Sequence, residues 1–269
     1  MAVEVFNRYE NKYLLDGETA LWLQDRLAES MEPDAHNRRR ALYTIANLYY
    51  DTEDSHLIRT SLAKPRYKEK LRLRAYGVPA GADEVYVEIK KKVRGLVNKR
   101  RSAMPLGEAY AFLRGGPLTY RPPMNRQVLR EAAYLTERCA PRPKLCLAYE
   151  RRAYFGVGRH DLRVSFDTNL RARRTALRLE AGTHGAPLLD DGMWIMEIKV
   201  ARSIPVWLCR LLSEARVYPV SFSKYGAEYK RRLRGGSLDH GNCDLLFDGT
   251  SFDVTSDVTS MEKVGGLYV

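Results

Sequence analysis

The stretch Glu84-Val-Tyr-Val-Glu-Ile-Lys-Lys-Lys92 alternates apolar and charged residues with a period of two. Side chains two residues apart lie on the same face of a β-strand, so this pattern predicts a strand with an apolar face of valine and isoleucine. The opposite face carries Glu88 and Lys90. A charged face of this kind either meets water or lines a binding site, and the other segments of the chain favour a binding site.

The composition is that of a soluble globular protein with an unusual charge. The chain has 269 residues, of which 45% are hydrophobic and 29% charged, and its formal net charge is +12. This basic excess favours a polyanionic partner, such as nucleic acid, an anionic membrane surface or phosphate chains. The four cysteines lack metal-ligand spacing and are expected to be reduced thiols. With no apolar leader and no run near ~20 apolar residues, the sequence predicts a cytoplasmic protein without a membrane span.

Alternation, together with β-branched and aromatic content, predicts about eight strands. They are expected at Val3–Leu15, Leu42–Tyr50, Glu69–Tyr76, Val85–Lys92, Lys144–Phe155, Leu162–Leu170, Ala176–Glu180 and Trp194–Ala201. Helices are expected at Gly17–Met31, Asn125–Cys139, Pro205–Val217 and Ser223–Leu233. Few strands are joined by two-residue turns or alternate regularly with a helix, which favours an α+β, mostly antiparallel fold over a doubly wound parallel sheet. Residues 1–235 are expected to form one domain, and residues 236–269 a flexible acidic tail.

Charged faces recur in strand after strand, and basic side chains outnumber acidic ones on them. These faces hold Arg8, Glu10 and Lys12; Lys70, Arg72 and Arg74; Glu84, Glu88, Lys90 and Lys92; Tyr149 and Arg151; Arg163, Ser165 and Asp167; Glu197 and Lys199. A sheet with one face in water explains any single strand. Clustered cations, however, are costly unless an anion neutralises them, which phosphate chains do through charge-assisted hydrogen bonds. Glu10, Glu88 and Glu197 would then be available to hold a divalent cation.

Eight short motifs, in family order, resemble the VTC-domain polyphosphate polymerases, which belong to the triphosphate tunnel metalloenzymes. They are RYENKY (Arg8–Tyr13), NLYYDT (Asn47–Thr52), KLRLRAYG (Lys70–Gly77), VEIKKK (Val87–Lys92), YERRAY (Tyr149–Tyr154), RVSFDTNL (Arg163–Leu170), MEIKV (Met196–Val200) and SFSKYG (Ser221–Gly226). The resemblance covers roughly residues 4–233. It implies a closed, roughly eight-stranded antiparallel tunnel barrel with flanking helices and a charged lumen.

The resemblance also implies an activity and a site. It implies an enzyme that transfers the γ-phosphate of ATP to inorganic polyphosphate, with a divalent metal, Mn²⁺ or Mg²⁺. Catalytic roles would fall to Arg72, Arg74, Lys90, Arg151, Arg163 and Lys224. Phosphate-binding roles would fall to Lys12, Lys70, Tyr149, Lys199 and Ser223. The metal would be held by Glu197, helped by Glu10 or Glu88.

Two alternatives stay open. Related tunnel enzymes hydrolyse triphosphates or cyclise ATP and usually open with Glu-x-Glu-x-Lys, whereas Arg8 stands here in the place of the first Glu. That difference favours a polyphosphate binder over a two-metal hydrolase. The family often has a further lysine where Ser221 stands, so the product end would have one cation fewer. A nucleic-acid-binding barrel suits the charge and the 17 tyrosines, but the carboxylates interleaved among the cations argue against it.

Overall fold

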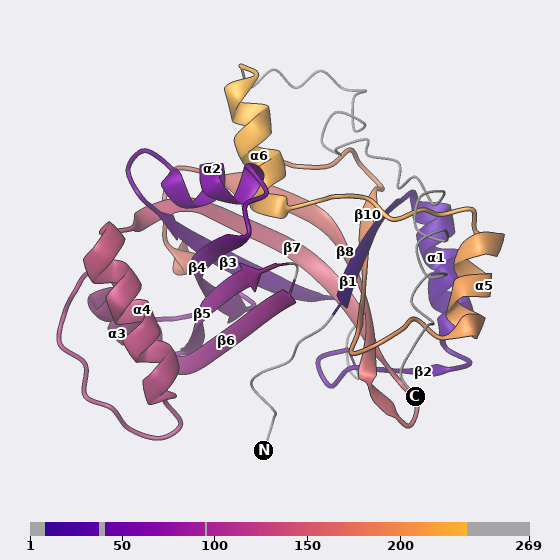
Figure 1. Ribbon diagram of the computed structural model, residues 1–269, viewed down its shortest axis with the longest axis horizontal. Helices are drawn as coiled ribbons and strands as arrows, with labels where there is room; N and C mark the ends of the chain where they lie inside the picture. Colours follow the sequence, from indigo (N-terminus) through magenta and orange to yellow (C-terminus); the bar gives the residue numbers. More distant parts are fainter. Residues whose placement is uncertain (1–8, 38–40, 95, 236–269) are drawn as a thin grey trace, which may run out of the picture.

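The computed structural model describes residues 9–37, 41–94 and 96–235, and one curved antiparallel sheet dominates it (Figure 1). Its strands are β1 (Tyr9–Leu15), β2 (Met31–Pro33), β3 (Tyr43–Asp51), β4 (Tyr67–Tyr76), β5 (Glu84–Val93), β6 (Leu96–Pro105), β7 (Arg142–Gly156), β8 (Arg159–Arg173), β9 (Ala186–Pro187) and β10 (Trp194–Val200). The main path runs β1-β10-β8-β7-β3-β4-β5-β6, while β2 pairs with β7 and β9 with β8. The predicted α+β, mostly antiparallel class is confirmed.

Six α-helices surround the sheet in the described residues. They are α1 (Gly17–Leu27), α2 (His56–Leu62), α3 (Leu106–Leu113), α4 (Arg126–Cys139), α5 (Val206–Glu214) and α6 (Lys224–Leu233). The four helices predicted from the sequence are present as α1, α4, α5 and α6, with ends shifted by a few residues. Asn125 is the N-cap of α4, and its side chain accepts a hydrogen bond from the Val128 amide at 3.2 Å.

The helices cover the convex face of the sheet in two groups. Leu71 and Leu73 of β4 and Val85, Val87 and Ile89 of β5 are buried in a core that includes side chains of α3 and α4. A second core joins the apolar faces of β1, β8 and β10 to α1 and α5. Figure 1 shows these two pairs of helices at opposite sides of the molecule. Because the apolar half of each alternating strand faces outward to a helix, the charged half faces the concave side.

A third core closes one end of the concave side. Phe222, Tyr225 and Tyr229, in and just before α6, pack with Ile58 of α2 against residues of β3, β7 and β8 such as Leu147. In Figure 1, α2 and α6 lie together above the curved strands. This packing places the N-terminus of α6 next to the charged strand faces.

The predicted closed barrel is not confirmed. In the described part of the chain, β1 and β6 are the two ends of the hydrogen-bonded path and do not pair with each other. Glu10 of β1 instead makes an ion pair with Lys90 of β5 at 3.3 Å. Backbone pairing requires strands about 4.8 Å apart, whereas long side chains bridge a wider separation. Charged side chains of β1, at one end of the path, and of β5, next to the strand at the other end, therefore meet, and the sheet is open and curved.

Two other expectations differ from the structure. The prediction of a strand at Ala176–Glu180 is wrong, because this segment bends and leads into a 3₁₀ turn at Leu179–Ala181. The buried Arg173 guanidinium causes the bend by donating to the carbonyls of Ala176, Arg178, Gly182 and His184. The strand β6 was not predicted. Arg8 and the proposed tail, residues 236–269, lie outside the described residues.

Candidate functional site

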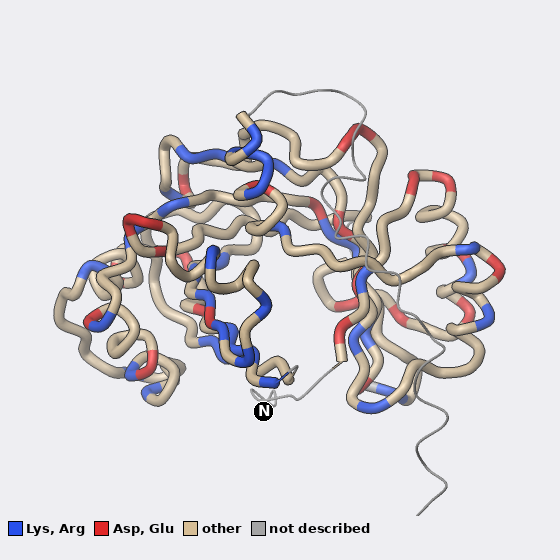
Figure 2. The backbone as a smooth tube through the Cα atoms, turned by 45° about the horizontal axis from the view of Figure 1, so that its top comes forward, with Lys and Arg blue, Asp and Glu red and all other residues tan. Residues whose placement is uncertain are grey.

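The concave face encloses a cavity of about 360 Å³ with a strongly basic lining. Twelve lysines and arginines and three glutamates line it. All fourteen residues predicted for the site are among the lining residues: Glu10, Lys12, Lys70, Arg72, Arg74, Glu88, Lys90, Tyr149, Arg151, Arg163, Glu197, Lys199, Ser223 and Lys224. In Figure 2, Lys and Arg positions recur along the central strands that surround it. The charged faces of separate strands therefore converge on one space.

The strand β4 shows how the lining is ordered. Its concave face presents Lys68, Lys70, Arg72, Arg74 and Tyr76 in succession. At about 3.3 Å per residue, this row is on the order of 26 Å long. Lysine stands at one end of the row, arginine in the middle and tyrosine at the other end. The chemistry of the cavity therefore changes along the strand direction.

Four arginines, here called the arginine zone, occupy the middle of the cavity, and a polar partner fixes each one. They are Arg72, Arg74, Arg151 and Arg163. Arg72 Nε donates to Glu88 Oε2 at 2.8 Å, and Arg72 Nη1 donates to Tyr49 Oη at 2.8 Å. Arg74 Nε donates to Asn47 Oδ1 at 2.9 Å. A guanidinium held in this way presents its remaining N–H groups in a fixed direction, as bidentate binding of a phosphate requires.

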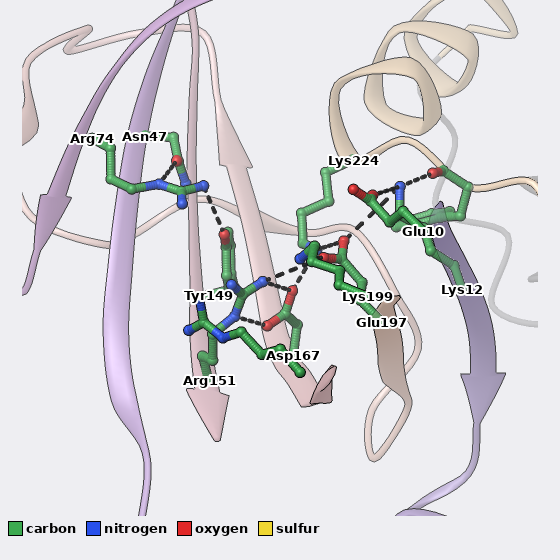
Figure 3. Close-up of polar contacts among 12 residues, drawn as sticks. Glu10, Lys12, Asn47, Arg74, Tyr149, Arg151, Asp167, Glu197, Lys199 and Lys224 are labelled. Atoms are coloured by element: carbon green, nitrogen blue, oxygen red, sulfur yellow. Dashed lines mark hydrogen bonds and ion pairs between the residues drawn. The ribbon is translucent and has the colours of Figure 1, made fainter. Parts of the chain in front are cut away.

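The same arrangement recurs on β7 and β8. Arg151 forms a two-point ion pair with Asp167, at 2.5 Å from Nε and 2.7 Å from Nη2. Lys224 at the start of α6 donates to the same carboxylate at 2.6 Å (Figure 3). Asp167 is fully buried, and Arg163 is held by the buried Asp34 at 3.0 Å. Burial alone would raise the pKa of Asp167, but Arg151 and Lys224 hold it below its usual value, so the carboxylate stays charged.

Glu197 is the most densely paired carboxylate in the cavity. It accepts from Lys199 at 2.6 Å and lies 3.9 Å from Lys12, 3.9 Å from Arg151 and 3.8 Å from Lys224 (Figure 3). Burial opposes its charge, yet these cations hold its pKa well below the usual range. Glu197 is therefore ionised at all physiological pH values and is a weak base.

Tyr149 lies between the arginines. Its hydroxyl accepts from Arg74 Nη2 at 3.3 Å, and its ring faces Lys224 at 4.6 Å and Arg151 at 5.3 Å. Burial alone would raise the pKa of this phenol, but Arg74 and Arg151 lower it. Because Arg74 occupies an acceptor position of the hydroxyl, its proton is available for donation to an anion in the cavity.

Glu10 and Glu197 lie close together, whereas Glu88 stands apart. Glu10 and Glu197 are on the neighbouring strands β1 and β10, and Lys12 Nζ lies 3.0 Å from one carboxylate and 3.9 Å from the other. Glu88 is bound instead by Arg72 at 2.7 Å and Lys99 at 2.7 Å. Among the described residues, no group of three His, Cys, Asp or Glu side chains is arranged to hold a metal ion. The structure thus brings together two of the three predicted metal ligands.

The N-terminus of α6 adds a further contact point. Ser223 caps the helix by accepting from the Gly226 amide at 3.2 Å, and Lys70 Nζ donates to the same hydroxyl at 3.0 Å. Lys12 Nζ donates to the Phe222 carbonyl at 2.8 Å. Free amide groups and the helix dipole make such a terminus favourable for an anion, and here two lysines stand beside it.

A second cavity, here called the lysine groove, continues from the first beyond Lys70. Its volume is about 280 Å³, and its seven lysines are Lys12, Lys64, Lys68, Lys70, Lys90, Lys92 and Lys230. Burial, together with Lys90, Lys12 and Lys68, lowers the pKa of Lys70 to about 7. Ser221, the position where the family often has lysine, also lines this groove. The positive charges of these lysines repel one another, and a bound anion would reduce that repulsion.

Sequence reasoning missed the contribution of β6. Lys99 and Arg101 line the cavity opposite β5, with Lys99 paired across from Lys90 and Arg101 across from Glu88. The signal was present as two cations spaced two residues apart, Lys99 and Arg101. It was weak because only Ser102 and Met104 of this strand are buried on the apolar side. Asp34, which orients Arg163, gave no signal because it lies in a loop.

Comparisons with known proteins gave one family match and several similar solved structures. A family model for the VTC domain matches residues 7–232. A putative adenylate cyclase from Bacillus halodurans is similar, with 13% identity over 82% of this chain and 96% of that chain and a TM-score of 0.49. A putative adenylyl cyclase from Hippeastrum, described as having a dominant triphosphatase activity, shares 14% identity over 88% of this chain and 97% of that chain with a TM-score of 0.46. No curated protein matches.

None of the helices in the described ranges is long and apolar enough to cross a bilayer. The family model spans all the strands and helices described above except the last residue of α6, and it includes every residue that lines the cavity. The ordered motifs, the antiparallel sheet and the basic cavity agree with that match. The chain therefore belongs to the VTC domain family.

Proposed function

We propose that this protein is a phosphotransferase that lengthens inorganic polyphosphate with the γ-phosphate of ATP. The observation that supports it best is the continuous row from the arginine zone to the lysine groove. Twelve basic side chains line the main cavity against three acidic ones, and the row continues into the groove past Lys70. A single triphosphate would occupy the arginines, whereas only a longer polyanion would also use the lysines beyond them.

In this proposal, Arg72, Arg74, Arg151 and Arg163 bind the phosphates of ATP from three strands, and Tyr149 donates a hydrogen bond to them. Lys224 and Ser223 contact the phosphates next to α6, while Lys12, Lys199, Lys70 and Lys90 neutralise the charge between the nucleotide and the polymer. These groups are held by their own partners before any ligand binds. Catalysis of phosphoryl transfer depends largely on such positioning and charge neutralisation.

Glu10 and Glu197 fit a divalent cation, Mn²⁺ or Mg²⁺, that binds together with the nucleotide. Both carboxylates are ionised and share Lys12 as a neighbour. Mg²⁺ is usually bound by one or two carboxylates plus substrate phosphates, so two ligands suffice. When bound, the ion would supply charge neutralisation at the phosphate oxygens. Glu88 lies on β5, apart from these two carboxylates on the paired strands β1 and β10, and its proposed part is to orient Arg72.

The transfer itself needs no base. A terminal oxygen of the polyphosphate chain, already anionic, attacks the γ-phosphorus. A new P–O–P bond forms, the bond from the γ-phosphorus to the β–γ bridging oxygen breaks, and ADP leaves with that oxygen. Attack by water, as in a triphosphate hydrolase, would require a group to accept a proton. The proposed transfer needs no such group, because the attacking phosphate oxygen is already ionised.

The test is direct. Purified protein is incubated with ATP and Mn²⁺, and the products are separated on a gel that resolves phosphate chains. We expect long chains, with one ADP released for each phosphate incorporated. ADP with free orthophosphate and no chains would show a hydrolase instead. Displacement of bound ATP by DNA as readily as by polyphosphate would support the nucleic-acid alternative and overturn the proposal.

A further inference from the structure

The end of the cavity opposite the lysine groove is aromatic. Four rings, here called the aromatic mouth, gather there: His36, Tyr43, Tyr76 and Tyr86. His36 stacks on Tyr76 with ring centroids 4.6 Å apart and an angle of 8° between the rings, and it lies 5.1 Å from Tyr43. Tyr86 meets Tyr76 edge-on at 5.8 Å. They come from the loop after β2 and from β3, β4 and β5, so tertiary packing alone assembles the cluster.

Two features show that this cluster is more than core packing. Tyr43 and Tyr76 line the phosphate-facing cavity, and His36 is exposed. The His36 ring stacks on one face of Tyr76, and Tyr76 also lines the cavity. Aromatic side chains at the rim of a basic site provide the stacking surface that nucleobases use.

A cation stands against the same rings. Arg101 of β6 lies 4.6 Å from the Tyr86 ring centroid, and its Nη1 donates to the Tyr76 hydroxyl at 3.4 Å. Arginine stacks on planar rings and also binds phosphate, so it suits the junction between a base and a phosphate chain. Arg101 lines the cavity as well, which connects the aromatic mouth to the arginine zone.

We propose that the aromatic mouth binds the purine base of the nucleotide substrate, at the cavity side of Tyr76 and Tyr43. This inference rests on the proposed function and adds the direction in which the triphosphate lies along the cavity. From the base, the triphosphate extends along Arg74 and Arg72 toward Lys70, so the γ-phosphate points to the lysine groove. The growing polymer then occupies the groove and never passes the aromatic rings. Because stacking uses the π-face that every base has, ATP and GTP are expected to bind with similar affinity.

The experiment compares two ligands that differ only in the nucleoside. Binding of ATP and of inorganic tripolyphosphate is measured by calorimetry, with the same divalent ion, for the unmodified protein and for Tyr76→Leu. We expect the affinity for ATP to fall about 10-fold, the size of one base stack, and the affinity for tripolyphosphate to stay within about 2-fold. Tyr76→Phe keeps the ring and should keep ATP binding, which separates stacking from the loss of the Arg101 contact.

A matched control uses another tyrosine beside an arginine. Tyr134 on α4 is 63% exposed, has Arg138 at 5.6 Å from its ring centroid, and lies outside both cavities. Tyr134→Leu should leave both affinities unchanged. If Tyr76→Leu lowers the affinities for both ligands equally, or does not lower the affinity for ATP, the proposed base site is wrong. The proposed phosphate site would be unaffected by that result. Absence of tripolyphosphate binding to the unmodified protein would instead overturn the proposed function, and the base site with it.

Discussion

The arginine zone and the lysine groove are both basic, but neighbouring residues hold their side chains differently. Arg72 and Arg151 each form short contacts with a buried carboxylate, Glu88 or Asp167. In the groove, Lys68 donates to the Ser61 carbonyl at 2.9 Å, and Lys92 is partly exposed. Arginine presents a rigid, directional fork, whereas lysine is a hydrated point charge on a flexible stem. In the proposed function, the arginine zone would fix phosphates for reaction and the lysine groove would let a chain slide.

The largest effect is expected at Glu197, in the reacting part of the cavity. In Glu197→Gln the side chain keeps its size but loses the charge that pairs with Lys199, Lys12 and Lys224. Turnover should fall about 10³-fold, because charge stabilisation by a bound metal contributes several kcal/mol. Affinity for tripolyphosphate measured without metal should stay equal or rise, since the cavity gains net positive charge. Retained turnover would refute the proposed metal role of Glu197.

The comparison between the two regions is tested most directly by exchanging their side chains. Arg72→Lys keeps the charge but removes the fork, and turnover should drop about 10²-fold, as when one preorganised donor is lost. The reciprocal change Lys92→Arg in the groove should leave turnover within about 2-fold, because an exposed cation needs no fixed geometry. Initial rates of ADP release measure both. Similar losses in the two variants would remove the distinction between the regions.

Lys70 lines both cavities, and its titration is expected to have an effect of intermediate size. Its pKa of about 7 is below the usual lysine value because of burial and the neighbouring Lys90, Lys12, Lys68 and Arg72. A bound anion favours the protonated form, so affinity is higher below pH 7 and falls as pH rises above it, by at most about 10-fold per unit. We expect Lys70→Arg, which stays charged, to show a flatter dependence of tripolyphosphate affinity between pH 6 and 9, measured by calorimetry. Identical slopes for both proteins would contradict the shifted pKa.

The smallest effect is expected from removing one groove lysine. Lys92→Gln should leave tripolyphosphate affinity unchanged, because a short ligand occupies the arginine zone alone. Affinity for long polyphosphate should fall up to about 5-fold, the scale of one exposed charge, and product chains on a gel should be shorter. Raising the salt concentration should reduce the difference between the variants. Equal weakening of short and long ligands would mean that the groove belongs to the triphosphate site.

Much of the site could be predicted because of the period-two pattern. In β4 and β5 the apolar residues Leu71, Leu73 and Val87 alternate with charged or polar residues, so the charged residues predicted for the site were assigned to one face. The prediction failed where the pattern was weak or interrupted. In β6 few apolar residues mark the outer face, and at residues 176–180 the Arg173 hydrogen bonds replace strand pairing with a bend.

The sequence by itself determined which side chains share a face, because strand geometry alternates side chains regardless of what surrounds them. It also determined that those faces carry an excess of cations. Only the tertiary structure decided how far the sheet curves, that Glu10 of β1 meets Lys90 of β5, and that His36 stacks on Tyr76. These outcomes depend on helices and loops distant in sequence, whose packing energies no local pattern encodes.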